Sequence, residues 1–356
     1  MTGPTALILD VDTGIDDSLA LLYAAGSPDA ELVAVTCVSG NTDARQVATN
    51  TLAVLELAGR TDVEVALGRE MPLVRPLETT PETHGPLGLG HAELPPPTRA
   101  MSDRHAVDVI LEEAHRRPGE IELVTLGPLT NLAVALGQDP ELPRLLHGFT
   151  LMGGAFGVPG NTTPTTEWNI HCDPEAAKFV FRAWADARAA DPTIARPLAL
   201  GLDVTERARL LPEHVVRLAR RAGSTPDDSI ALARGEDPMI ATRSVASDPI
   251  VRFVADALRF YMEFHARYDG FYGAFIHDPL ALAVALDRSL VTTEALYVDV
   301  ETTGELTTGM TVADRRRITG KAPNLDVATS ADVATFLDRL IERVGGLAAA
   351  RAGVAG

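Results

Sequence analysis

Apolar positions along the chain follow two alternating periods, and these periods predict the elements of an α/β fold. Short apolar runs suited to buried strands occur at residues 6–10, 31–38, 63–67, 121–126, 148–152 and 197–202. Between them, apolar residues at helical spacing predict helices at residues 16–25, 43–58, 103–116, 129–136, 174–188 and 212–222. Strands that alternate with helices favour an open, doubly wound, mostly parallel sheet flanked by helices.

The rest of the chain predicts a long helix at residues 248–268, a helix that begins at Pro279, further strands from residue 290 and a closing helix from residue 331. Three stretches lack either period, at residues 70–101, 153–168 and 224–247. Because ligands of open α/β sheets bind beyond the carboxyl ends of the strands, these long loops are candidate walls of a site. No linker divides the chain, so we expect one domain over residues 1–350 and a frayed tail at 351–356.

Charge and cysteine content narrow the class of protein. The formal net charge of the 356-residue chain is −18, which argues against nonspecific nucleic-acid binding, since such binding draws on a positive field. The two cysteines, Cys37 and Cys172, are too few for a disulfide framework. No N-terminal stretch is typical of a signal peptide, and no segment approaches the roughly 18 apolar residues of a membrane-spanning helix. We therefore expect a cytoplasmic protein without membrane contact.

Four aspartates are crowded at the turn between the first predicted strand and the first helix: Asp10, Asp12, Asp16 and Asp17. Gly14 is expected to supply the backbone freedom that such a turn often needs. Two carboxylates about 4 Å apart repel by about 4 kcal/mol at an effective dielectric constant of about 20. Helix capping explains one or two of these acids but not four. A hard divalent cation is the simplest group that would neutralise the cluster.

The same segment also allows a phosphotransferase interpretation. Its beginning resembles the Asp-x-Asp-x-Thr loop of haloacid-dehalogenase-type phosphotransferases, in which the first aspartate attacks phosphorus. Asp227 and Asp228 are the candidates for the second acidic pair of such an enzyme, but they fall in a polar loop and not after a strand. This alternative explains neither Asp16 and Asp17 nor the motifs that follow.

Polar residues also follow the later strands. Asn41 ends the second strand, and the carbonyl of Leu126, at the end of the fourth, is an ordinary type of calcium ligand. Asn161, Glu167 and Asn169 combine amides with a carboxylate, a set that suits vicinal hydroxyls because these need both donors and acceptors. Taken alone, Asn41 is more often a turn or cap residue than a ligand contact, and the set of Asn161, Glu167 and Asn169 is equally compatible with a solvated loop.

Two histidines stand in distinctive segments. His277 precedes Asp278 and Pro279, and Asp-Pro alone is more typical of a helix start than of a site. The histidine carries more weight, since it titrates near neutrality and can serve as an acid. His84 opens the glycine-rich segment HGPLGLG.

The series of motifs resembles the calcium-dependent nucleoside hydrolase family of the inosine–uridine-preferring type. The motifs that carry the resemblance are DVDTGIDD at residues 10–17, Gly40-Asn41, LGPLTN at residues 126–131, Asn161 with Glu167-Trp168-Asn169, and His277-Asp278-Pro279. They run across most of the chain in the family's order. The resemblance implies an open α/β sheet in one domain and hydrolysis of the N-glycosidic bond of a small-molecule ribonucleoside to ribose and free base.

The resemblance also implies a role for each motif. Ca²⁺ would be held by Asp12, Asp17, the carbonyl of Leu126 and Asp278, with Asp10 supporting them. The substrate would be bound by Asp16, Asn41, His84, Asn161, Glu167 and Asn169, with Met152 packing against the ribose. Asp12 would act as general base on the metal-bound water, and His277 would help to protonate the leaving base. A homodimer or homotetramer is expected.

Two features leave parts of this expectation open. Leu87 stands where the family's loop usually has an acid, so the ordering that the acid provides is in question. The aromatic ring that stacks on the base could come from Phe264, His265, Tyr268, Phe271 or Tyr272. A nucleoside-binding protein that has lost catalysis is a further alternative, although the intact aspartate and histidine sets disfavour it.

Overall fold

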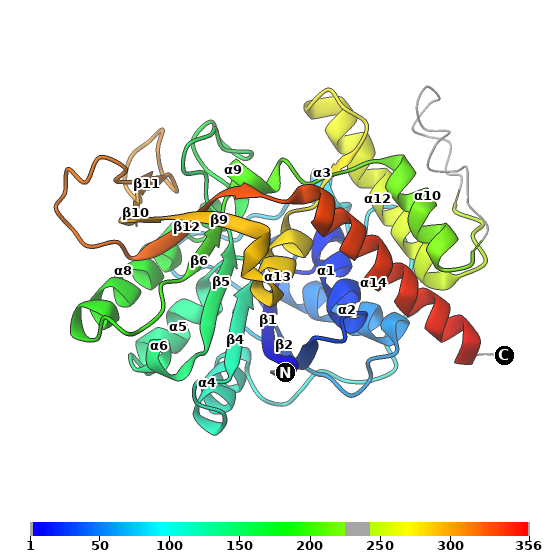
Figure 1. The fold of residues 1–356 in the computed structure, drawn as a ribbon, viewed down its shortest axis with the longest axis horizontal. Helices are drawn as coiled ribbons and strands as arrows, with labels where there is room; N and C mark the ends of the chain where they lie inside the picture. The colour runs from blue at the N-terminus through cyan, green and yellow to red at the C-terminus, as the bar shows by residue number, and fades with distance from the viewer. Residues whose placement is uncertain (1–2, 225–242, 355–356) are drawn as a thin grey trace.

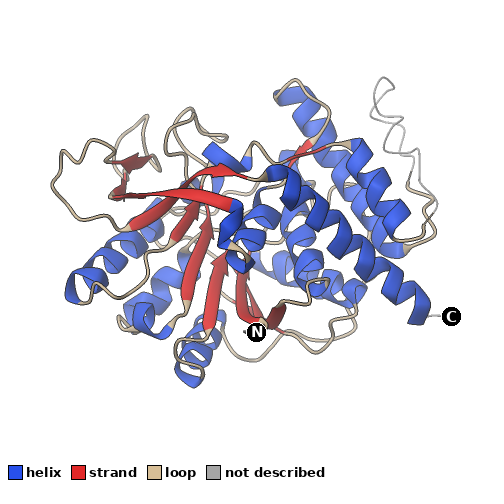
Figure 2. Ribbon diagram, in the orientation of Figure 1, coloured by secondary structure: helices blue, strands red, loops and turns tan. Residues whose placement is uncertain are grey.

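A computed structural model of the protein describes residues 3–224 and 243–354. Its centre is an eight-stranded sheet with the strand order β3-β2-β1-β4-β5-β6-β12-β9 (Figures 1 and 2). The strands are β1 (Thr5–Val11), β2 (Ala30–Cys37), β3 (Glu64–Leu67), β4 (Ile121–Thr125), β5 (Gly148–Met152), β6 (Leu198–Leu200), β9 (Val291–Leu296) and β12 (Leu325–Ala331). All neighbouring strands pair in parallel except β12 and β9, which are antiparallel. The predicted doubly wound, mostly parallel sheet is confirmed.

Helices cover both faces of the sheet. On one face lie α1 (Ile15–Ala25), α2 (Ala44–Ala58), α13 (His277–Leu286) and α14 (Val333–Val354), and on the other α4 (Ala106–Arg116), α5 (Thr130–Gln138) and α8 (Pro174–Ala190). Strand β1 shows why two layers form: Leu7 and Leu9 belong to the first core and Ile8 to the second. Successive side chains of a strand point to opposite faces, so an uninterrupted apolar run fills both cores.

Several helix boundaries differ by a few residues from those predicted, among them the starts of α4, α13 and α14. Helix α13 begins at His277 and not at Pro279. Proline is tolerated throughout the first turn, because the N–H groups there have no intrahelical partner. Helix α14 begins at Val333 and continues to Val354, so part of the predicted tail is helical.

Several short elements were not predicted, because their runs are too short to show a period. They are α3 (Pro81–His84), α6 (Leu142–Leu145), α7 (Trp168–Cys172), α9 (Leu202–Thr205) and the 3₁₀ helix Arg288–Leu290. Two small antiparallel pairs join β7 (Arg209–Leu210) to β8 (Ala274–Phe275) and β10 (Val298–Val300) to β11 (Thr311–Ala313). The β7–β8 pair brings the end of α9 beside the start of α13.

Two further helices, α10 (Pro212–Arg221) and α12 (Pro249–Tyr268), lie beside α14 at one side of the molecule (Figure 1). Across the ranges that the structure describes, no helix is long and apolar enough to cross a membrane.

Candidate active site

The turn after β1 is held by its own acidic side chains. Asp17 closes it, since its Oδ1 accepts the Asp12 N–H at 3.2 Å and its Oδ2 accepts the Gly14 N–H at 2.9 Å. The carboxylate of Asp12 is fixed in turn, because its Oδ2 accepts the backbone N–H of Asn41 at 2.9 Å. Asn41 follows β2, so two adjacent parallel strands deliver their ends to the same place.

Gly14 is needed in this turn for a reason other than the one predicted. Its φ of −100° and ψ of −153° do not require the special freedom of glycine. A Cβ atom there would lie 2.5 Å from Nδ1 of His84 and 2.7 Å from Nδ2 of Asn41. Close approach of two side chains therefore excludes a larger residue.

A group of three buried carboxyls forms when α13 packs beside this turn. Asp16, Asp17 and Asp278 each offer an oxygen, and these oxygens lie within 4.8 Å of one another. Burial, together with the charge of Asp17, raises the pKa of Asp16 to about 8. Burial and the charges of Asp16, Asp17 and Asp12 raise the pKa of Asp278 as well.

Asp12 lines the same cavity as Asp16 and Asp278. Burial and the charge of Asp17 raise the pKa of Asp12. A buried, oxygen-only set of donors whose charges repel fits a hard divalent cation, because the cation would offset both the burial and the repulsion.

Asp10 lies beneath this group and is fully buried. Its Oδ1 accepts hydrogen bonds from Thr36 Oγ1 at 2.6 Å and from Asn131 Nδ2 at 2.8 Å. Its Oδ2 has no hydrogen-bond partner within the described ranges, and burial raises its pKa to about 7. Asn131 also donates to the Cys37 carbonyl at 3.1 Å, so it ties β1 to β2. The sequence showed Asn131 in a motif but gave it no role.

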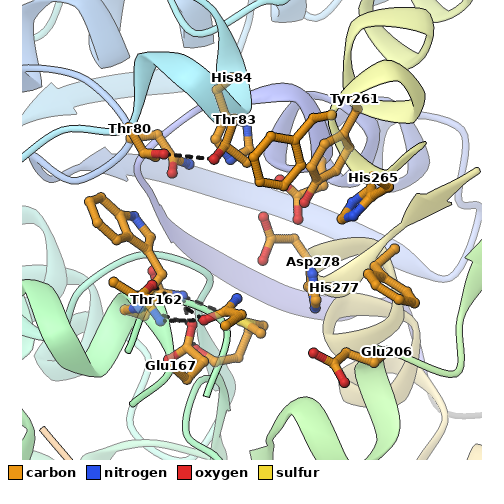
Figure 3. A pocket seen from close by; sticks show the side chains of 18 of the residues that line it. Thr80, Thr83, His84, Thr162, Glu167, Glu206, Tyr261, His265, His277 and Asp278 are labelled. Carbon is orange, nitrogen blue, oxygen red and sulfur yellow. Dashed lines mark hydrogen bonds between the residues drawn. The ribbon is translucent and has the colours of Figure 1, made fainter. Parts of the chain in front are cut away.

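Asp12, Asp16 and Asp278 line a cavity of about 520 Å³, whereas Asp10 and Asp17 do not reach its wall. Its wall contains most of the predicted site residues: Asp12, Asp16, Asn41, His84, Leu126, Met152, Asn161, Glu167, Asn169, His277 and Asp278. Asp278 and His277 project between the Tyr261–His265 wall and the loop of Glu167 and Thr162 (Figure 3). Residues distant in sequence therefore meet at the carboxyl edge of the sheet.

On one side of the cavity, amide and carboxylate groups are fixed by the backbone. Glu167 caps α7: its oxygens accept the N–H groups of Asn169 at 2.9 Å, Ile170 at 3.2 Å and Gly154 at 3.0 Å. Asn169 Nδ2 donates to the Leu126 carbonyl at 2.6 Å. Asn161 is exposed and accepts the Trp168 N–H at 3.1 Å. These bonds orient the polar groups before any ligand arrives.

On the other side lie two buried histidines. His277 Nδ1 is 2.8 Å from Thr205 Oγ1, at the end of α9. Burial lowers the pKa of His277 to about 3, helped by His265 and His84, so the ring is neutral at pH 7. His84 Nδ1 accepts the Ile15 N–H at 3.1 Å, and burial lowers its pKa to about 3.

The loop that carries Leu87 is held by another residue. Asn50 Nδ2 donates to the Leu87 carbonyl at 2.8 Å and to the Thr13 carbonyl at 3.1 Å. The Leu87 side chain is 63% exposed. Asn50 thus joins the loop to the acidic turn through backbone carbonyls.

The pocket wall also contains residues that the sequence reasoning missed, namely Thr80, Glu82, Thr83, Gly160, Thr162, Trp168, Glu206, Tyr261, Asp269 and Phe275. A signal for Tyr261 existed. Tyr261, Phe264, His265 and Tyr268 have the spacing i, i+3, i+4, i+7, which places them on one face of α12. Of the predicted aromatic candidates, Phe264, His265 and Tyr268 line the pocket, and Phe271 stacks on His265 with ring centroids 5.6 Å apart.

Buried carboxylates at the carboxyl edge of a parallel sheet, with a histidine in the same cavity, are typical of an enzyme active site. Comparison with known proteins agrees. The family described as inosine-uridine preferring nucleoside hydrolase matches residues 7–338 of the chain. The pyrimidine-specific ribonucleoside hydrolase RihA of Enterobacter sp. (strain 638) is 37% identical over 340 residues, 95% of this chain and 97% of that protein.

Solved structures show the same likeness. The purine-preferring ribonucleoside hydrolase from Gardnerella vaginalis has a TM-score of 0.83 at 32% sequence identity, and the match covers 97% of this chain and 100% of that one. An inosine-guanosine nucleoside hydrolase has a TM-score of 0.78 at 27% identity, over 96% of this chain and 98% of that one.

The chain therefore belongs to the inosine-uridine preferring nucleoside hydrolase family, and it is a hydrolase that acts on the N-glycosyl bond of ribonucleosides. Membership decides against the phosphotransferase alternative. Asp227 and Asp228, the acidic pair of the phosphotransferase alternative, lie outside the described residues.

Proposed function

We propose that the cavity binds a ribonucleoside and that its residues hydrolyse the N-glycosidic bond with Ca²⁺ at the acidic group. One observation carries the proposal: His277 and Asp278 are adjacent at the start of α13 and line one cavity of about 520 Å³ together with Asp12 and Asp16. Asp278 would then contact the cation that binds the ribose, and the adjacent His277 would contact the base of the same nucleoside. The cavity has the size of a small-molecule site.

The acidic group suits calcium by its donors. Asp12, Asp17 and Asp278 with the carbonyl of Leu126 would hold the ion, and Asp10 would support them from beneath. Ca²⁺ takes six to eight oxygen ligands in flexible geometry, and the substrate's hydroxyls would add oxygens to this set. When bound, the ion would neutralise the buried carboxylates and lower the pKa of a water molecule.

The ribose would lie against the residues that the backbone orients. We assign its hydroxyls to Asp16, Asn41, Asn161, Glu167 and Asn169, with Met152 packed against the ring. The support is their common place in the wall and the fixed hydrogen bonds of Glu167 and Asn169. Carboxylates beside the sugar would stabilise the positive charge that develops as the bond breaks.

Asp12 and His277 are the residues that would act on protons, one at the attacking water and the other at the leaving base. Asp12 uses Oδ2 for the Asn41 N–H, so we assign Oδ1 to taking the proton of the attacking water. The neutral His277 would donate a hydrogen bond from Nε2–H to the leaving base and so stabilise the negative charge that develops there, while Thr205 donates its hydroxyl proton to Nδ1. Thr205 is then a positioning residue that sets the tautomer.

Release of ribose tests the proposal. The protein is stripped with a chelator and assayed with inosine, uridine, cytidine and adenosine, each with added Ca²⁺, Mg²⁺ or neither. We expect reducing sugar from at least one nucleoside, with Ca²⁺ the better ion. No release from any ribonucleoside with Ca²⁺ present would contradict the proposal. Nitrophenyl phosphate is the control substrate and should yield no phosphate. The cytoplasmic location and the homodimer or homotetramer stay predictions.

A further inference from the structure

Asn131 is a fully buried asparagine in the first turn of α5, and its side chain contacts the ends of three neighbouring strands. Its Nδ2 donates to Asp10 Oδ1 in β1 at 2.8 Å and to the carbonyl of Cys37, the last residue of β2, at 3.1 Å. Its Oδ1 accepts the backbone N–H of Arg69, which follows β3, at 2.8 Å. Since α5 itself follows β4, this one amide joins the ends of four adjacent strands.

The chain leaves space for this amide at a distant glycine. A Cβ atom on Gly68 would lie 2.3 Å from Asn131 Oδ1 and 2.5 Å from its Nδ2. Gly68 is not among the glycines with positive φ, so close approach and not backbone conformation explains the residue. A larger residue at this position would displace the amide from its partners.

Asn131 lies between two acceptor oxygens that would otherwise face each other. Its Nδ2 donates to both the Asp10 carboxylate and the Cys37 carbonyl, and Thr36 Oγ1 holds the same Asp10 oxygen from β2 at 2.6 Å. Without the amide, two buried oxygens would lose a shared donor, and their repulsion would favour a shift of the strand ends. Neither Asn131 nor Asp10 belongs to the cavity wall, so any effect on the site passes through the turns that they connect.

These turns carry two of the proposed calcium ligands. Asp12 lies two residues after Asp10, and Leu126 lies five residues before Asn131. The two turns already contact each other, since the Asp10 carbonyl accepts the Leu126 N–H at 2.8 Å. A Cβ atom on Gly127 would lie 2.9 Å from Asp12 Oδ1, so the β4 turn reaches the carboxylate itself. A small shift of one turn would therefore change the distance between the ligand oxygens.

We propose that Asn131 is a positioning residue that sets the affinity of the acidic group for Ca²⁺. It does so by holding the turn of Asp12 against the turn of Leu126 through its hydrogen bond to Asp10. Partners that orient metal ligands without touching the ion commonly change metal affinity 10- to 100-fold. This inference rests on the proposed function for the identity of the ion and of its ligands.

Calcium affinity, measured apart from turnover, tests the inference, and Asn324 provides a matched control. Asn324 is also buried, its Nδ2 donates to the carbonyls of Phe181 at 3.0 Å and Val298 at 2.9 Å, and its Oδ1 accepts the Val298 N–H at 2.8 Å. Asn131→Ala and Asn324→Ala therefore each remove three hydrogen bonds. Both proteins and the wild type are stripped with a chelator, unfolded in urea and titrated calorimetrically with Ca²⁺.

We expect both substitutions to lower the free energy of unfolding, whereas only Asn131→Ala should raise the Kd for Ca²⁺, by about 10- to 100-fold. An unchanged Kd for Asn131→Ala, or an equal rise in both variants, would overturn the inference. Should Asn131→Ala fail to fold, Asn131→Ser, which retains one donor, is titrated in its place under the same criterion.

Gly68→Ala provides a second route, because its Cβ would displace the amide while every donor remains in the protein. It should also raise the Kd, and Gly137→Ala, whose Cβ meets nothing within 4 Å, should not. A Gly68→Ala variant with the Kd of the wild type would count against the inference.

Ribose release by the wild type separates the two proposals. Tighter binding of Ca²⁺ by the wild type than by Asn131→Ala, without release of ribose from any ribonucleoside, would support the inference and contradict the proposed function. Release of ribose with equal Kd values for the two proteins would do the reverse. A wild-type protein that binds no Ca²⁺ would contradict both.

Discussion

Nδ1 of His84 accepts a hydrogen bond of 3.1 Å from the backbone N–H of Ile15, the first residue of α1. The N-cap of this helix is Gly14, and the N–H groups of the first turn have no acceptor within the helix. His84 supplies an acceptor from the end of α3, and it occupies the space that a Cβ of residue 14 would enter. Helix α3 is thereby bound to the helix that carries Asp16 and Asp17.

Gly14→Ala should lower the free energy of unfolding by about 1–3 kcal/mol, because the new Cβ would displace His84 and Asn41. Urea denaturation at equilibrium measures it. The matched control is Gly137→Ala in α5, where a Cβ meets nothing within 4 Å and where alanine should stabilise the helix by up to about 1 kcal/mol. Equal effects of the two substitutions would contradict the close-approach explanation.

His84→Ala should leave the Ile15 N–H unsatisfied and lower the free energy of unfolding by about 1–3 kcal/mol. The comparison is His147→Ala, which removes an exposed histidine and should change stability little. Urea denaturation with a chelator present avoids stabilisation by bound metal. A His84 variant as stable as the His147 variant would remove the capping role.

The stability of the metal-free protein should fall between pH 6.5 and pH 8.5. Burial raises the pKa of Asp16 to about 8 and that of Asp10 to about 7, from an ordinary value of 3.8, so the folded protein holds protons that the unfolded chain has released. Folding is then favoured at the acid end of this window. The buried His84 and His277 act with the opposite sign, but only below their ordinary pKa of 6.5.

Asp16→Asn should flatten this pH dependence, and saturating Ca²⁺ should reverse it, because the ion replaces protons on the carboxyls. Denaturation curves at the two pH values, with chelator and with Ca²⁺, measure both effects. The expectation fails if the metal-free wild-type protein is equally stable at pH 6.5 and pH 8.5.

Asp12→Asn should lower kcat by about 10²- to 10⁴-fold, since an amide cannot take a proton from water. Asp62→Asn, at an exposed aspartate that pairs with Arg60, is the control and should retain wild-type turnover. Ribose release under saturating Ca²⁺ is the measurement. Near-normal turnover of the Asp12 variant would remove this residue from the base role.

Thr205→Val should slow natural nucleosides about tenfold and affect nitrophenyl riboside little. The reason is that the hydroxyl sets the His277 tautomer, and nitrophenolate leaves without a proton donor. Thr193→Val, at an exposed threonine, controls for loss of a hydroxyl. Equal losses on both substrates would show that Thr205 acts on something other than the leaving group.

The sequence by itself determined strands β1 to β6 of the main sheet and the acidic turn, whereas for β9 and β12 it indicated only further strands after residue 290. The spacing of apolar residues can be recognised within each segment, since each strand or helix must bury one of its own faces. The acids of the turn are also close in sequence, so their convergence follows from a single strand–turn–helix unit. The aromatic face of α12 was visible for the same reason, although Tyr261 was overlooked.

Only the tertiary structure decided which residues of different elements contact one another. Asp278 joins Asp16 and Asp17, and Thr205 reaches His277, because parallel strands bring their carboxyl ends to one edge and the β7–β8 pair sets α9 beside α13. His84 caps α1 from the end of α3, a helix too short to show a period in the sequence. Contacts between elements depend on strand order and on how side chains of distant segments pack together, so the sequence of a single segment does not predict them. The requirement for glycine at residue 14 is an example, because it comes from His84 and Asn41, which only the fold brings beside it.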